Sequence, residues 1–308
     1  MLDPAEHARL DALFGGIASL AATPRTIEEL SGGLTNYNLK VTTPDGVFVA
    51  RCNRSDTVLL GIDREAEQHN TRAAELSGVG APFVEYRPDL GILVIGFLNG
   101  HSYENEDLQR PGVLPRAAKA IKQLHDGPRF AGDFDMFLRQ SRYLETLTAG
   151  GHRMPADYRT YDPQFQRIKT ALAVLRGPTV PCNNDLLAGN FVDGGDTIWI
   201  IDYEYSGNND PYFELGNTWT ECGLSDEQLD EFVTAYVGHR DSCLVARTRL
   251  QATVSRYGWS LWGFIQAATN DFDFDFYGWG FERYEAAVAD FESSEFETLL
   301  ATASGVTS

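Results

Sequence analysis

The chain has 308 residues, of which 43% are hydrophobic, 44 are acidic and 25 are basic. This length suits two lobes of ordinary size, and this hydrophobic content excludes a disordered chain. The formal net charge of −19 argues against nucleic acid and anionic membranes as partners, and it is compatible with a cationic substrate, which an acidic surface attracts.

The first part of the chain is rich in strand patterns. Residues 5–20 predict an amphipathic helix. Between residues 27 and 54, two apolar runs flank Pro44-Asp45-Gly46, and Asp-Gly between such runs is a strong hairpin signal. Residues 62–76 then predict a helix, and residues 83–98 predict two more strands.

The second part of the chain is mostly helical. Asn99-Gly100 is typical of a hinge between the two parts. We therefore predict an α+β fold with a β-rich lobe over residues 1–98, a mostly helical lobe over residues 99–308, and a cleft at the hinge. The helices predicted after the hinge span residues 115–126, 134–147, 163–175, 211–222, 226–237, 246–268 and 277–292.

The sequence shows no sign of export or of a membrane segment. No apolar run is long enough to span a membrane, and the first residues lack the basic and apolar regions of a signal peptide. The four cysteines are widely separated and form no metal-ligand spacing with the six histidines. We therefore expect free thiols in a cytoplasmic protein with no membrane insertion.

Three polar side chains between residues 185 and 202 carry the strongest functional signal. Asp185 is followed five residues later by Asn190, and Asp202 ends the apolar run Thr197 to Ile201. Asp and Asn are common in turns, so the first pair alone could be an ordinary loop. The turn at residues 193–196 between two short apolar runs predicts a hairpin, however, and a hairpin brings Asn190 close to Asp202.

These three side chains supply what phosphoryl transfer from ATP requires. One carboxylate, Asp185, orients the attacking hydroxyl and accepts its proton. An amide and a carboxylate, Asn190 and Asp202, suit Mg²⁺, which binds through few protein groups and the substrate phosphates. The spacing between Asp185 and Asn190 is the one found in the catalytic loop of protein kinases.

The β-rich lobe carries candidate nucleotide-binding residues. Gly33 lies at a predicted hairpin tip, where backbone N–H groups can approach phosphate, and Thr35 and Asn36 add side-chain donors. A Gly-Gly pair in such a place is often only a turn. Arg51, at a strand end, is expected to pair with the phosphates, and an acid on the next helix is expected to orient it, with Glu67 favoured over Glu65.

Two further features complete the predicted cleft. Backbone groups around Ile95 to Phe97 are expected to bind adenine, although this apolar strand would exist in any core. Trp259 and Trp262 lie three residues apart, on one face of a helix, in an aromatic-rich region. Such a stripe is often plain core, but it can also form an aromatic cage for a quaternary ammonium ion. Tyr205 and Glu221 are placed to contribute to that cage.

Taken together, four motifs resemble the choline/ethanolamine kinase family, which belongs to the aminoglycoside-phosphotransferase group with a protein-kinase-like fold. They are Gly32-Gly33-Leu34-Thr35-Asn36, Asn184-Asp185 with Asn190, Ile201-Asp202 with Glu204 and Tyr205, and Trp259 with Trp262 and Gln266. The likeness spans roughly residues 30 to 290. It implies ATP and Mg²⁺ as cofactors. Glu204 is then either a ligand of a second metal ion or a residue that supports the direct ligands of the first ion.

The resemblance also implies a set of residues around the acceptor. Arg283-Tyr284 matches the arginine-aromatic pair that closes the family pattern. The chain departs from the pattern at Asn183, where histidine is usual, and at Glu214, where aspartate is usual. The choline pocket of the family matches Tyr205, Glu221, Trp259, Trp262, Phe274 and Trp279, the last in place of a tyrosine.

We therefore expect an ATP-dependent phosphotransferase that phosphorylates the hydroxyl of choline. Ethanolamine, a thiamine-like alcohol and an aminoglycoside remain alternative acceptors. A nucleotide-binding pseudokinase that serves as a scaffold is the alternative of a different class, and only Asn183 favours it. A homodimer is left open.

Overall fold

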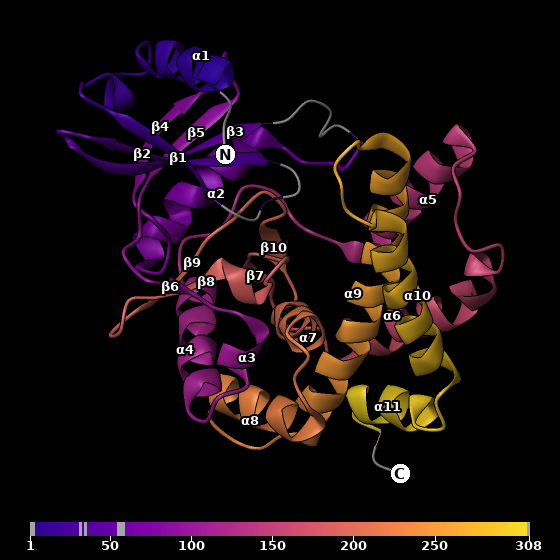
Figure 1. Cartoon of the computed structure of the whole chain (residues 1–308). Helices are drawn as coiled ribbons and strands as arrows, with labels where there is room; N and C mark the ends of the chain where they lie inside the picture. The colour runs from indigo at the N-terminus through magenta and orange to yellow at the C-terminus, as the bar shows by residue number, and fades with distance from the viewer. Residues whose placement is uncertain (1–3, 31–32, 34–35, 54–58, 307–308) are drawn as a thin grey trace.

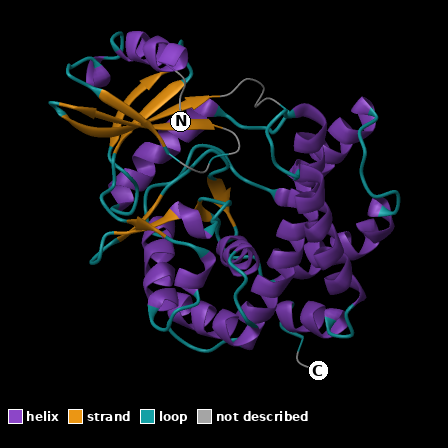
Figure 2. Cartoon of the chain, in the orientation of Figure 1, coloured by secondary structure: helices purple, strands orange, loops and turns teal. Residues whose placement is uncertain are grey.

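The computed structural model describes residues 4–30, 33, 36–53 and 59–306. Its N-terminal part is built on one antiparallel sheet, and its C-terminal part is mostly helical (Figures 1 and 2). No described helix is both long and apolar enough to cross a membrane.

The N-terminal sheet has five strands in the order β1-β2-β3-β5-β4. The predicted hairpin is present, because Thr43 pairs with Gly46 across its turn. Buried and less buried residues alternate along β2 from Leu39 to Thr43, which suits a strand with one face on the core. The strands are β1 (Thr26–Glu29), β2 (Asn36–Thr43), β3 (Gly46–Asn53), β4 (Phe83–Arg87) and β5 (Ile92–Gly96).

Two helices flank this sheet. Helix α1 (Pro4–Phe14) buries Leu10 and Phe14 in a core shared with strand residues such as Val41. The predicted helix of residues 5–20 is therefore too long: it stops before Gly15 and Gly16, which favour helix ends, and a short 3₁₀ turn follows at Ala18–Leu20. Helix α2 (Arg64–Ser77) lies on the side of the sheet that faces the helical part (Figure 1).

The C-terminal part contains the predicted helices, most of them with shifted ends, and two short ones that were missed, at Asn105–Leu108 and Phe296–Ala303. Helix α9 begins four residues before the predicted start because Asp241 caps it, accepting bonds from Cys243 N and Leu244 N. The short C-terminal helix α11 was not predicted. The helices are α3 (Asn105–Leu108), α4 (Val113–His125), α5 (Met136–Gly150), α6 (Asp162–Val174), α7 (Pro211–Glu221), α8 (Asp226–Val237), α9 (Ser242–Thr269), α10 (Phe276–Glu292) and α11 (Phe296–Ala303), with 3₁₀ turns η2 (Tyr158–Tyr161) and η3 (Ala188–Asn190).

Two small sheets lie between the N-terminal sheet and the helices and carry the polar motif (Figure 1). β8 (Phe191–Asp193) and β9 (Ile198–Ile200) form the predicted hairpin, and β6 (His101–Ser102) extends it. β7 (Val180–Cys182) pairs with β10 (Gly207–Asn209). The division between residues 98 and 99 stays a prediction, although it falls between β5 and β6.

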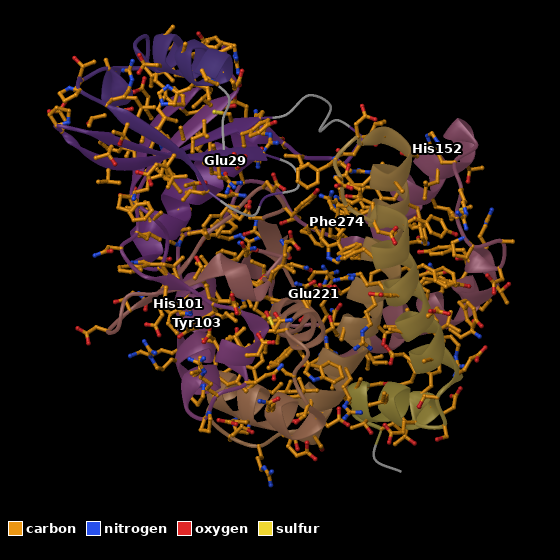
Figure 3. All side chains as sticks on the ribbon, viewed as in Figure 1. Glu29, His101, Tyr103, His152, Glu221 and Phe274 are labelled. Atoms are coloured by element: carbon orange, nitrogen blue, oxygen red, sulfur yellow. The ribbon has the colours of Figure 1, made fainter. Side chains whose placement is uncertain are left out.

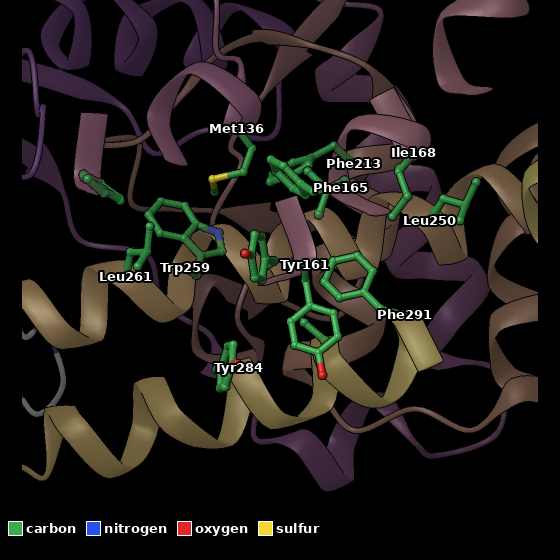
Figure 4. Close-up of a cluster of buried hydrophobic side chains, with 14 of the residues drawn as sticks. Met136, Tyr161, Phe165, Ile168, Phe213, Leu250, Trp259, Leu261, Tyr284 and Phe291 are labelled. Carbon is green, nitrogen blue, oxygen red and sulfur yellow. The ribbon is translucent and has the colours of Figure 1, made fainter. Parts of the chain in front are cut away.

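Glycine permits the close packing of α9 on α10. A Cβ atom at Gly263 would lie 2.8 Å from both Gly280 Cα and Phe276 O, closer than atoms pack. The two helices bury a large aromatic cluster, which includes Trp259, Tyr284 and Phe291 (Figure 4). Their spacing therefore also sets the position of the predicted acceptor-binding residues.

We predict that Gly263→Ala lowers the free energy of unfolding by about 1–3 kcal/mol, because the added methyl group forces the two helices apart. Denaturant unfolding would measure this. Gly177→Ala is the matched control, since a Cβ there meets no atom within 4 Å, and its effect should stay within about 0.5 kcal/mol. Equal stability of both variants would contradict close α9–α10 packing.

Candidate active site

A buried carboxylate holds the loop that carries Asp185. Glu214, on α7, is fully buried and accepts bonds from Asn183 N at 3.0 Å and Asn184 N at 2.6 Å. Asn184 adopts the left-handed conformation with φ of 69°, which asparagine tolerates better than most residues. The loop is therefore fixed through its backbone just before Asp185.

Asn183, the main departure from the family pattern, ties this loop to Asp202. Its side-chain amide donates to Ile201 O at 3.0 Å and to Asp202 O at 2.7 Å. Its side-chain oxygen accepts from Asp185 N at 3.1 Å. Asn183 thus organises the backbone on both sides of the site, so its presence is no argument for an inactive scaffold.

The structure brings Asn190 close to both Asp185 and the strand that ends before Asp202. The Asn190 amide donates to Asp185 O at 2.8 Å, and Asn190 O accepts from Ile201 N at 3.0 Å. The expected proximity of Asn190 and the end of β9 is confirmed. The Asn190 side-chain nitrogen is used in the bond to Asp185 O, so the side-chain oxygen points away from Asp185 O. No described residue donates to that side-chain oxygen.

This arrangement fits Mg²⁺. Asn190 and Asp202 offer hard oxygen atoms, the type this ion requires. In this structure Asp202 Oδ1 accepts a 2.6 Å bond from Arg51 Nη2, so the carboxylate already faces a cationic group. Asp202 also has a positive φ of 67°, unusual for a non-glycine residue and consistent with a functional constraint.

Negative charge is crowded around Asp185. Burial raises the pKa of the half-buried Asp185 carboxyl well above its usual range, and the nearby charges of Asp202 and Glu221 raise it further. Glu204 acts in the same direction, whereas the positive charge of Arg283 opposes it. A carboxylate with a raised pKa is a stronger base once ionised, which suits proton abstraction from a hydroxyl.

On the nucleotide side, Arg51 is paired as expected. Arg51 is 6% exposed, and its Nη2 lies 3.3 Å from Glu67 Oε1. Glu65 is exposed on another face of α2, so the preference for Glu67 as the pairing acid is confirmed. Burial alone would lower the pKa of Arg51, but Asp202 and Glu67 raise it overall, so the guanidinium stays charged.

Arg64 is a member of this network that the sequence analysis missed. Its Nη1 lies 2.6 Å from Glu67 Oε2 and 3.3 Å from Glu204 Oε2, and its Nη2 donates to Asn36 Oδ1 at 3.0 Å. The signal was present, because Arg64 and Glu67 lie three apart at a helix start capped by Asp63. What the sequence did not show was the contact with Glu204, 140 residues away.

The loop at the sheet edge is described only in part. Gly33 has a positive φ of 95°, and a Cβ there would lie 2.7 Å from Asn38 Nδ2, so the position requires glycine. Asn36 is buried and donates to Glu204 Oε2 at 2.8 Å, so its amide is already engaged in this structure. Thr35 lies outside the described residues.

Two of the backbone groups expected near adenine already have partners. Phe97 N donates to Val47 O at 3.0 Å and Gly96 N donates to Pro82 O at 2.7 Å, so neither amide is available to adenine. The Phe97 ring instead contacts the ammonium of Lys40, at 5.0 Å. Ile95 does line a small cavity of about 10 Å³, together with Arg51, Thr71, Ala81, Leu93, Ile201, Asp202 and Tyr203.

The predicted aromatic residues on the acceptor side lie together. Trp262 Nε1 donates to Tyr205 OH at 2.7 Å, and the Trp262 ring lies 5.1 Å from that of Trp279. Trp259 packs edge-on against Tyr205, with ring centres 4.9 Å apart. It is 4% exposed, and its Nε1 has no hydrogen-bond partner among the described residues. Trp262 is 6% exposed, so both indoles on α9 are largely buried in the aromatic core.

Glu221 already has a cationic partner. Its carboxylate forms two bonds with Arg283, from Nε at 3.0 Å and from Nη2. The Arg283 guanidinium also lies 3.4 Å from the centre of the Trp279 ring. The structure thus shows the Arg283 cation held by Trp279 and Glu221, which were both predicted to line the cage.

Phe274 is more exposed than the other aromatic residues, at 40%, and lies before α10. Its ring contacts Phe276, whose centre is 4.9 Å away. In Figure 3, Phe274 lies nearer the five-stranded sheet than Glu221 does. It therefore belongs to the same side of the helical part as the cage, but at its outer edge.

A second cluster of potential ligands lies behind the loop. His125, Cys182 and Glu214 are all buried, and their potential ligand atoms lie close enough together to hold one metal ion. Burial and the charge of Glu214 raise the pKa of the Cys182 thiol, which keeps it protonated. Both Glu214 oxygens accept backbone N–H groups, and His125 Nδ1 contacts Tyr236 OH at 2.7 Å, so these contacts support the loop rather than a metal ion.

Comparison with known proteins identifies the family. Residues 27–288 match the family model of choline/ethanolamine kinases. The chain is 24% identical to a probable ethanolamine kinase of Arabidopsis thaliana over 293 residues, covering 84% of this chain and 78% of the relative. It is 27% identical to the protein LicA of Haemophilus influenzae over 247 residues, covering 75% of this chain and 70% of the relative.

A solved structure supports the same assignment. The crystal structure of a choline/ethanolamine kinase family protein from Mesorhizobium loti superposes with a TM-score of 0.86 at 29% identity. The alignment covers 97% of this chain and 99% of the other, which confirms the expected α+β fold. The chain therefore belongs to the choline/ethanolamine kinase family of phosphotransferases, which act on an alcohol group.

Proposed function

We propose that the protein transfers the γ-phosphoryl group of ATP to the hydroxyl of choline, with Mg²⁺ as cofactor. One observation carries the proposal: Asp185 lies next to Asn190 and the end of β9, and the side-chain amide of the preceding Asn184 donates to Tyr205 O of the aromatic cluster at 3.2 Å. A base, two oxygen ligands and an aromatic surface for a cation thus share one region.

In the proposed reaction, Asp185 orients the acceptor hydroxyl and takes its proton as the oxygen attacks the γ-phosphorus. The bond between that phosphorus and the bridging oxygen of ADP breaks, and ADP leaves with the electron pair. Mg²⁺, held by Asn190 and Asp202 with Glu204 nearby, would neutralise phosphate charge. Arg51, and the backbone at Gly33 with Thr35 and Asn36, would steady the phosphates.

The surroundings of the acceptor favour choline over ethanolamine. A quaternary ammonium has no N–H group and is bound well by aromatic faces, with tryptophan the best. The ammonium of ethanolamine carries N–H donors that need acceptors, and Glu221, the predicted carboxylate, is already engaged by Arg283. Ethanolamine remains the second candidate, because the Arabidopsis relative is named a probable ethanolamine kinase.

Two further statements remain proposals. A cytoplasmic location rests on the four free cysteines, two of which are buried, since disulfides are rare in reducing compartments. A homodimer stays a prediction without a specific interface.

We predict that Mg²⁺-dependent release of ADP from ATP is stimulated by choline with a higher kcat/KM than by ethanolamine, because the cage offers aromatic faces rather than acceptors. Parallel assays with choline, ethanolamine, a thiamine-like alcohol, an aminoglycoside and no acceptor would measure this. A higher kcat/KM for ethanolamine would establish the second candidate, and no stimulation by any acceptor would favour the scaffold.

The Trp262→Ala variant tests whether the cage causes this preference. Loss of the indole should raise KM for choline by a factor equivalent to about 1–2 kcal/mol while KM for ATP stays nearly constant. Trp219→Ala is the control, because that indole donates to Ser225 O and contacts Arg249 and Arg256 instead. Equal changes in both KM values would mean that Trp262 is purely structural.

We predict that Asp185→Asn abolishes turnover and raises the melting temperature at about pH 8, because it removes a carboxylate whose charged form is disfavoured by burial and by neighbouring negative charges. The pKa of Asp185 is raised in the folded state. The contribution of this carboxyl to the free energy of unfolding is therefore fully present below its unfolded pKa of about 4. It is lost as the pH rises through its folded pKa. The gain of the variant should accordingly vanish near pH 4.

Thermal unfolding across this pH range, in buffer without Mg²⁺, would measure the effect. The exposed Asp196 provides the control, and Asp196→Asn should leave the pH profile unchanged. If Asp185→Asn keeps its kcat, the assignment of the base is wrong. If it is less stable than the parent protein at about pH 8, the charge-crowding explanation is wrong.

A further inference from the structure

A second cavity lies between α5, α6, α9 and the start of α7, and it is lined by none of the residues assigned above to the nucleotide or the acceptor. Its volume is about 100 Å³. This is of the same order as an engineered apolar cavity of about 150 Å³ that binds benzene. Its apolar walls are formed by Phe134, Met136, Phe137, Leu172, Phe213 and Val254, of which Met136 and Phe213 are labelled in Figure 4.

One polar side chain in the buried wall has no partner. Gln251 is 5% exposed and lines the cavity, and its side-chain amide makes no hydrogen bond with any residue that the structure describes. Neither polar atom of this amide is fully enclosed, so a ligand or a water molecule in the cavity can bond to it. Gln251 and Val254 lie three residues apart on α9, so both present the same helix face to the cavity.

The cavity also has two basic side chains in its wall. Lys169 and Arg176 are exposed, and neither forms an ion pair with another described residue. Lys169 Nζ lies 5.4 Å from the centre of the Phe137 ring, which keeps it over the aromatic wall. The chain has a net charge of −19, so two cations without an ion-pair partner beside one cavity form a locally positive patch in an acidic protein.

The two carboxylates in the wall already have hydrogen-bond partners. Asp135 caps α5, and its Oδ1 accepts from Phe137 N at 2.8 Å and Leu138 N at 3.2 Å. Asp210 caps α7 and accepts a 3.2 Å bond from Arg247 Nη2. Counted as formal charges, Asp210 is balanced by Arg247, and Asp135 offsets one of the two cations Lys169 and Arg176. One positive charge is left over, which favours an anion at the mouth.

We propose that this cavity binds a small monocyclic aromatic carboxylate. The ring would lie against the apolar wall, the carboxylate would meet Lys169 and Arg176, and a polar group at the far end would bond to Gln251. Asn209 also lines the cavity and donates to Asn184 Oδ1 at 2.9 Å. The site thus lies one side-chain hydrogen bond from the loop that carries Asp185.

Titration calorimetry of the full chain with 4-hydroxybenzoate tests the proposal. We expect saturable binding at one site, weaker binding of the uncharged 4-hydroxybenzamide, and affinity that falls as salt is raised. The double variant Lys169→Ala/Arg176→Ala should bind the acid about fivefold more weakly, because exposed charge pairs each contribute modestly. Arg167→Ala, on the same helix but paired with Glu297, should bind as the parent protein does.

A second variant tests the inner end of the cavity. The parent protein should bind 4-hydroxybenzoate more tightly than benzoate, because the hydroxyl can bond to Gln251. Gln251→Leu nearly preserves the side-chain volume but removes the amide, so it should bind the two acids equally. Thermal unfolding would verify that both variants are folded. Absence of saturable binding by the parent protein, or equal affinity in the parent and the Lys169→Ala/Arg176→Ala variant, would overturn the proposal. These binding measurements do not depend on which acceptor is phosphorylated.

Discussion

The geometry of the active site depends on one buried carboxylate. Glu214 has no access to solvent and uses both oxygens to hold Asn183 N and Asn184 N. A buried carboxylate is stable only when hydrogen bonds replace water, and these two bonds do so while fixing the left-handed turn at Asn184. The position of Asp185 follows directly, because it is the next residue in the chain.

Several ion pairs lie across the site next to this loop. Carboxylates alternate with guanidinium groups: Asp202 faces Arg51, Glu67 and Glu204 face Arg64, and Glu221 faces Arg283. Each pair is largely buried, so removal of one partner would leave an uncompensated charge. In our proposal, Mg²⁺ and the phosphates join Arg51 and Asp202, and the head group of the acceptor approaches the aromatic rings near Arg283.

Much of this was predictable from sequence, because it depends on local patterns. The hairpin that joins Asn190 to the end of β9 follows from a turn between two apolar runs, and helix α8 spans the predicted residues 226–237. Helix geometry showed that Glu65 and Glu67 could not both face Arg51, and the structure places Glu67 against it. The family motifs then linked these pieces to one fold, which the solved relative confirms.

What could not be predicted depends on contacts between distant parts of the chain. The pairing of Arg283 with Glu221 joins residues 62 positions apart, and no local pattern encodes it. The engagement of the Gly96 and Phe97 amides could not be foreseen, because their partners, Pro82 and Val47, lie on other segments. Burial of both indoles on α9 is likewise a result of tertiary packing.

The most direct test of this account is the rate of phosphoryl transfer by Glu214→Gln with saturating ATP, Mg²⁺ and acceptor. Glutamine has one acceptor oxygen where two N–H groups need one each, so the loop should lose a charged hydrogen bond. We expect kcat to fall about tenfold to a hundredfold while the affinity for ATP is retained. The exposed Glu231 supplies the control, Glu231→Gln, which should behave as the parent protein. An unchanged kcat in a folded Glu214→Gln variant would contradict the claim that this carboxylate positions Asp185.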